Sequence, residues 1–104
     1  MKKFVLMGLI LISGQCLASD YKPIIGNSGA GIFANACVDC HGFEGQGALG
    51  SFFKLTGSTM PTEAIKIIIQ KGGALMPAFA NIKGEELEVL ATYVRSLGVP
   101  AISE

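Results

Sequence analysis

The string CVDCH at residues 37–41 is the part of this sequence best suited to chemistry. Cys37 and Cys40 are three residues apart, so at the end of a helix both thiols lie on one side. Two thiols so placed can add to the two vinyl groups of a haem, and His41 then lies under the ring, where its imidazole can bind iron. The pattern is the attachment signal of c-type haem. It predicts one covalent haem c.

Three other interpretations use parts of the same string. A disulfide between Cys37 and Cys40 suits an exported protein, but it gives His41 and the glycine-rich loop that follows no role. A zinc site needs four ligands, and the chain has one histidine in total. A dithiol redox motif is expected beside a βαβ pattern, which the sequence lacks. Haem attachment therefore remains the favoured interpretation.

A six-coordinate haem iron needs a second axial ligand, and no second histidine is present. The candidates are Met60 and Met76, both followed by proline. Met76 lies in a non-helical segment in which Gly72 and Gly73 let the backbone approach a flat ring. Met60 directly precedes Pro61 at an expected helix start. We predict Met76 as the ligand and keep Met60 as the alternative.

Residues 1–18 have the pattern of a signal peptide. Two lysines precede an uncharged run at residues 4–12, and small residues stand near a cleavage point after Ala18. A membrane-spanning helix needs about 20 apolar residues, so this run is too short to span. We expect residues 19–104 to form an exported, periplasmic domain with no membrane span once the signal is removed.

The chain has 104 residues with 8 basic and 8 acidic side chains, which gives no net charge. Half of the residues are apolar and 15% are charged, so the composition is that of a folded protein. The length indicates a single domain. The balanced charge gives no sign of nucleic-acid binding.

Apolar residues at three- and four-residue spacing predict helices. The first should begin near Asn27 or Ser28, the second should cover about 62–71 and the last about 84–97. The isoleucines at 65–69 are β-branched, so a strand is the competing prediction there.

Long irregular segments separate these helices, and the largest is the glycine-rich stretch 42–57. Loops of this length are uncommon in a small domain, and so short a chain has little core to hold them. We therefore expect an all-α fold of three to four helices around one haem, with long glycine-rich loops.

From about residue 28 to residue 98 the sequence resembles small monohaem class I cytochromes c of bacteria. The matching features follow one another in the family's order: the attachment string, Gly42, Gly45-Gln46-Gly47, Met76-Pro77 and a C-terminal helix with Tyr93. The resemblance implies a cytochrome c-like fold in which the first and last helices cross closely, with Gly29 and Tyr93 at the contact.

The resemblance also implies a function. It implies His41 and Met76 as axial ligands of the haem, and a single-electron carrier that is not itself an enzyme and exchanges electrons with other exported redox proteins. The alternatives are a haem subunit of a dehydrogenase or oxidase complex and a ligand-sensing haem protein.

The sequence departs from the family at a loop after the attachment string. Similar cytochromes often have a proline pair there, near a backbone carbonyl that accepts the histidine N–H. Phe53 and Lys54 occupy this place. A carbonyl needs no proline, so we expect the bond to survive in a less rigid loop.

Overall fold

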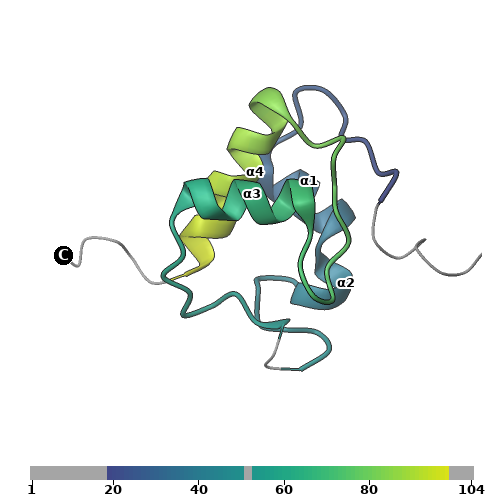
Figure 1. The fold of residues 1–104 in the computed structure, drawn as a ribbon. Helices are drawn as coiled ribbons and strands as arrows, with labels where there is room; N and C mark the ends of the chain where they lie inside the picture. Colours follow the sequence, from purple (N-terminus) through teal and green to yellow (C-terminus); the bar gives the residue numbers. More distant parts are fainter. Residues whose placement is uncertain (1–18, 51–52, 99–104) are drawn as a thin grey trace, which may run out of the picture.

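The computed structural model describes residues 19–50 and 53–98 (Figure 1). This part of the chain is helical and contains no strand, which confirms the predicted all-α class. The predicted signal peptide and its cleavage point lie outside the described residues. The helices are α1 (Gly29–Ala36), α2 (Val38–His41), α3 (Thr62–Lys71) and α4 (Gly84–Leu97).

Helix α1 begins where a capping side chain was expected. The hydroxyl of Ser28 accepts a hydrogen bond from the backbone N–H of Gly31 at 3.0 Å, which satisfies one of the free donors of the first turn. Helix α1 ends at Cys37, where φ is −118°. Cys37 therefore lies at the break, and the other residues of the attachment string form a separate turn, α2.

Helices α3 and α4 have the bounds that their sequence patterns predicted. The strand alternative for residues 65–69 is wrong: Ile65 and Ile69 lie on the buried face of α3. Tertiary packing of this apolar stripe outweighs the weak helix propensity of β-branched residues. Lys83 precedes α4 without a side-chain capping bond, as its residue type predicts.

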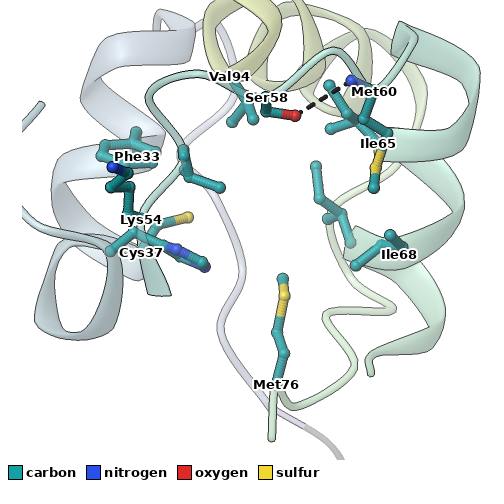
Figure 2. A pocket seen from close by; sticks show the side chains of 12 residues that line it. Phe33, Cys37, Lys54, Ser58, Met60, Ile65, Ile68, Met76 and Val94 are labelled. Carbon is teal, nitrogen blue, oxygen red and sulfur yellow. Dashed lines mark hydrogen bonds between the residues drawn. The ribbon is translucent and has the colours of Figure 1, made fainter. Parts of the chain in front are cut away.

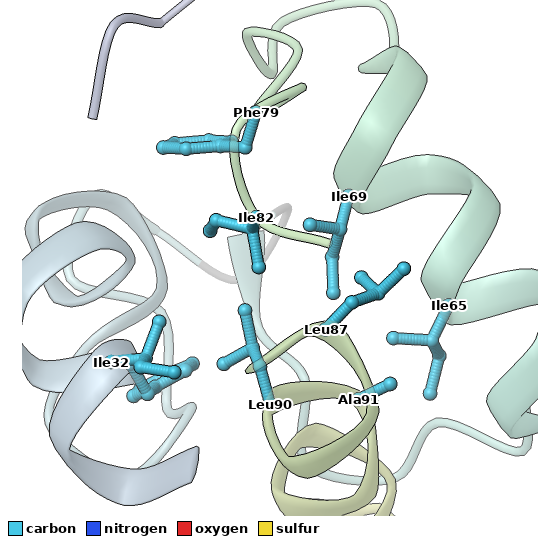
Figure 3. Packing of buried hydrophobic residues seen from close by; sticks show 9 residues of the cluster. Ile32, Ile65, Ile69, Phe79, Ile82, Leu87, Leu90 and Ala91 are labelled. Atoms are coloured by element: carbon cyan, nitrogen blue, oxygen red, sulfur yellow. The ribbon is translucent and has the colours of Figure 1, made fainter. Parts of the chain in front are cut away.

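The hydrophobic core joins α1, α3, α4 and the segment between α3 and α4 (Figure 3). Helix α4 packs against both α1 and α3. The fully or nearly buried apolar side chains are Ile32, Phe33, Ile65, Ile69, Phe79, Ile82, Leu87, Leu90 and Ala91. With so few buried residues, the core holds the three longer helices together and leaves the loops to be fixed by other contacts.

The contact between α1 and α4 is close because Gly29 has no side chain. A Cβ atom at Gly29 would lie 2.9 Å from Cβ of Tyr93 and would also strike the backbone of Val89. One turn further on, the rings of Phe33 and Tyr93 pack with centroids 5.2 Å apart and a tilt of 57°, a favourable aromatic geometry. The expected crossing of the first and last helices is confirmed.

Hydrogen bonds fix the segment that connects α3 to α4. The N–H of Phe79 donates to the carbonyl of Ile69 at 2.8 Å, and the amide of Gln70 donates to the carbonyl of Ile82 at 3.0 Å. Residues 74–77 of this segment, drawn in green in Figure 1, line one cavity together with Cys40 and His41 of α2. It is therefore a shaped loop that approaches the attachment string.

Residues 19 and 20 of the N-terminal segment are bonded to that loop, and the segment then turns at residues 25–26 before it reaches α1. The N–H of Ser19 donates to the carbonyl of Ala78 at 2.7 Å, and the side-chain amide of Asn81 donates to the carbonyl of Asp20 at 3.3 Å. In residues 19–50 and 53–98, no helix is both long and apolar enough to span a bilayer.

Candidate haem site

Two adjoining cavities of about 230 and 580 Å³ open beside the attachment string. The larger lies within the range of roughly 300–1,000 Å³ that is usual for cofactor sites. Five side chains line both cavities: Cys37, His41, Met60, Ile68 and Met76. The thioethers of Met60 and Met76, which are far from the motif in the sequence, therefore meet its imidazole and its first thiol at one place.

The walls of the smaller cavity are apolar. Figure 2 shows Phe33 and Cys37 on one side, and Ile65 and Ile68 of α3 on the other. Val94 of α4 closes one end. Apolar walls facing each other across an open space, with thiol and imidazole groups at the edge, fit a haem in both shape and chemistry.

The sequence pattern had identified the wall residues only as parts of apolar helical faces. Ile65 and Ile68 belong to the apolar face of α3, and Val94 belongs to that of α4. Helical spacing of apolar residues predicts that they are buried, but it does not tell whether they contact a cofactor or the protein core. Ser58, which also lines the smaller cavity, carried no sequence signal.

Cys37 and Cys40 are free thiols, both partly buried. Burial, and to a smaller extent the neighbouring Cys40, raises the pKa of Cys37 to about 12. Its sulfur therefore stays protonated at neutral pH and is a poor nucleophile by itself. Bound haem would supply the vinyl groups to which each S–H adds, with a sulfur–carbon bond formed and the proton taken by the other vinyl carbon.

His41 is oriented by a backbone carbonyl. Its Nδ1–H donates to the carbonyl oxygen of Phe53 at 2.6 Å, which confirms the bond expected without the proline pair. With Nδ1 occupied as a donor, Nε2 is left as the nitrogen that can bind a metal. The imidazole is thus held in the tautomer that an iron ligand needs.

The glycine-rich loop after the motif folds back onto it. The N–H of Gly47 donates to the carbonyl of His41 at 2.6 Å, and that of Ala48 donates to the carbonyl of Cys40 at 3.1 Å. Gly47 has a φ of +92°, a value that favours glycine. The carbonyl of Gly45 in turn accepts a hydrogen bond from the N–H of Leu55 at 2.7 Å. This bond holds the stretch of chain next to Phe53 against the glycine-rich loop.

Both candidate methionines reach the site. Figure 2 shows their side chains entering the cavity from different sides, Met76 from the loop after α3 and Met60 from the segment before it. Met76 is partly buried and packs against the core, whereas 38% of Met60 is exposed. Burial favours Met76, and the assignment of the ligand remains a prediction.

Charged side chains are sparse around the cavities. Lys54 lines the smaller cavity and Asp39 the larger one. No group of three or more His, Cys, Asp or Glu side chains gathers as a metal site anywhere in the described residues. The part of the chain that can be described thus offers no ligand set for the zinc alternative.

Comparison with known proteins agrees with the site. The family described as cytochrome c oxidase, cbb3-type, subunit III matches residues 26–94. The 4-cresol dehydrogenase (hydroxylating) cytochrome c subunit of Pseudomonas putida is 33% identical over 96 residues, which cover 90% of this chain and 78% of that protein. No solved structure matches the chain.

Proposed function

This chain belongs to the cytochrome c family, whose haem is covalently bound, and we propose that His41 and Met76 ligate the iron while Cys37 and Cys40 carry the thioether bonds. Family membership makes the protein a haem electron carrier. The assignment of these four residues is the proposal.

The observation that carries the proposal is the meeting of His41 and Met76 at one apolar cavity beside the two thiols. The bond from His41 Nδ1 to Phe53 prepares Nε2 as a ligand. A histidine–methionine pair raises the potential of a haem iron relative to two nitrogen ligands. Because both axial positions would be filled, no open site remains for a substrate, which favours single-electron transfer over catalysis.

The polypeptide contributes binding and orientation. Cys37 and the α2 turn after it present the thiols and the imidazole, the loop after α3 presents Met76, and the apolar walls would keep water from a bound ring. We propose that the mature protein acts in the periplasm and exchanges electrons with other redox proteins, because the first 18 residues have a signal-peptide pattern.

A second candidate function is a haem subunit held in a dehydrogenase complex. The observation that favours it is the similarity to the cytochrome subunit of 4-cresol dehydrogenase. Gentle purification from the native cell separates the two functions. A complex-bound subunit should elute with a larger enzyme at constant stoichiometry, whereas a free carrier should elute alone as a protein of about 10 kDa.

The ligand assignment is tested by replacing each methionine in the haem-loaded protein. Met76→Ala should abolish the weak far-red absorption band that methionine-ligated ferric haem gives, lower the midpoint potential and let the ferrous iron bind carbon monoxide. Met60→Ala is the matched control and should keep the band.

The opposite pattern in these two variants would assign Met60 as the ligand. Carbon monoxide binding by the unmodified protein would instead favour a ligand-sensing role, because it requires an open or weakly held axial position.

A further inference from the structure

We propose that Gly72 is the positioning residue for Met76, because its missing side chain lets the loop after α3 close tightly enough to hold the thioether in the haem cavity. The proposal rests on Met76 being an iron ligand, as proposed above.

The backbone of Gly72 has a conformation that other residues rarely adopt. Gly72 ends α3 with φ +81° and ψ 178°, a region populated almost only by glycine. A Cβ atom there would lie 2.7 Å from the carbonyl oxygen of Met76 and 3.0 Å from the nitrogen of Ala78. Both are backbone atoms, so no change of rotamer can relieve the contact.

Hydrogen bonds close the same loop and attach it to α3. The N–H of Gly73 donates to the carbonyl of Met76 at 3.0 Å, and the N–H of Gly72 donates to the carbonyl of Ile68 at 2.7 Å. Ile68 lines both cavities. The backbone of Met76 is thereby fixed relative to one wall of the cavity.

A methyl group at position 72 would push the Met76 backbone away from α3. The loop itself is exposed at Gly73, Ala74 and Leu75, so it has room to move outward without unpacking the core. A ligand bond needs its donor atom placed within about 0.5 Å. The expected result is a folded haem protein whose methionine–iron bond is weakened or lost.

The test compares three glycine-to-alanine variants of the haem-loaded protein. Gly72→Ala introduces both the contact and the unfavourable φ. Gly57→Ala places alanine at a comparable φ of +88°, and no atom lies within 4 Å of the new methyl. Gly73→Ala adds a methyl at a position that has neither a close contact nor a positive φ. Gly57→Ala therefore controls for backbone strain, and Gly73→Ala for an added methyl in the same loop.

Gly72→Ala should lose the far-red methionine band, bind carbon monoxide in the ferrous state and have a lower midpoint potential, while both controls stay like the unmodified protein. Retention of the band in Gly72→Ala would overturn the proposal, and so would equal loss in Gly57→Ala. Absence of the band from the unmodified protein would instead overturn the proposed ligand, so the two failures are distinguishable.

Amide hydrogen exchange in the unmodified haem protein supplies a second test that does not depend on a variant. The Gly73 amide should exchange more slowly than those of its exposed neighbours Ala74 and Leu75, because it is bonded within the closed loop. Equally fast exchange at the three positions would show that the loop is open and overturn the proposal, even where Gly72→Ala yields no haem-loaded protein.

Discussion

The imidazole of His41 and the carbonyl of Phe53 are joined by a hydrogen bond of 2.6 Å across twelve residues of chain. The acceptor is a backbone atom, so the bond depends on the path of the loop and not on the side chain at position 53. A hydrogen bond to the distal nitrogen of a ligating imidazole orients the ring and raises its basicity. If His41 ligates the iron as proposed, the loop after the motif would act on the iron through this bond.

The Nδ1 proton of His41 should be protected from solvent exchange in the haem-loaded protein, and NMR of that proton measures this. Phe53→Leu should leave both the protection and the midpoint potential nearly unchanged, because it keeps the carbonyl. Rapid exchange of the Nδ1 proton in the unmodified protein would contradict the bond.

Replacing both Cys37 and Cys40 by alanine should abolish covalent haem attachment and leave a largely unfolded chain. The few buried residues cannot compensate for an empty apolar site, and a cofactor bound only by the folded state stabilises it by linkage. Intact mass should show haem on the unmodified protein alone. A sharp, cooperative melt of the double variant would contradict this prediction.

Gly29→Ala should destabilise the protein by about 1–3 kcal/mol, because the added methyl overpacks the contact with Val89 and Tyr93. Gly31→Ala in the same helix is the control, since the three atoms nearest to its methyl belong to the end of the Asn27 side chain, which can shift. Thermal or denaturant unfolding measures both. Equal stability of the two variants would mean that the helices have room to separate.

Leu90→Ala should cost about 2–5 kcal/mol, because Leu90 is fully buried among the core residues and leaves a cavity. Ile67→Ala, at a position that is 56% exposed on α3, should cost far less. Chemical denaturation of the haem-loaded variants gives the comparison. A small effect at Leu90 would indicate that α1 and α3 can collapse onto the vacated space.

Lys66 on α3 should stabilise the contact with α4 in a pH-dependent way. Its ammonium lies 2.8 Å from Glu88 and 3.0 Å from Glu63, and hydrogen bonds to Glu88 and then to Glu63 raise its pKa above the ordinary 10.5. The raised pKa means that the stabilisation is complete below pH 10.5 and is lost as the pH rises through the higher value found in the folded protein.

A double-mutant cycle of Lys66→Met and Glu88→Gln measures this contribution. The coupling between the two positions should be present at neutral pH, fall with added salt and disappear at strongly alkaline pH. Coupling that persists after Lys66 has lost its proton would show that packing, rather than charge, joins the two side chains.

The helices were predictable because their signals are local. Glu63 near the start of α3 and Gly72 at its end mark the bounds that the structure has, and these features act within one turn. The break at Cys37 was not predictable, because no glycine or proline marks it. It makes residues Val38–His41 a turn of their own.

The site was predictable in its residue types and less so in its geometry. The string at residues 37–41 and the two methionines were evident, whereas the choice between Met60 and Met76 depends on how two loops fold around an apolar space. The bond from Gln70 to the carbonyl of Ile82 shows why. The contacts that shape such loops join residues at irregular distances along the sequence, so no periodic pattern predicts them.

The bond from Ser19 to the carbonyl of Ala78 joins the predicted start of the mature chain to the loop that carries Met76. If the leader is removed after Ala18, as its sequence predicts, the donor becomes the new terminal ammonium, and the hydrogen bond gains a charge. Its acceptor lies two residues beyond Met76. If Met76 ligates the iron as proposed, the charged N-terminus produced by cleavage would help to hold the loop that carries this ligand, and a chain cleaved at another residue would lack that contact.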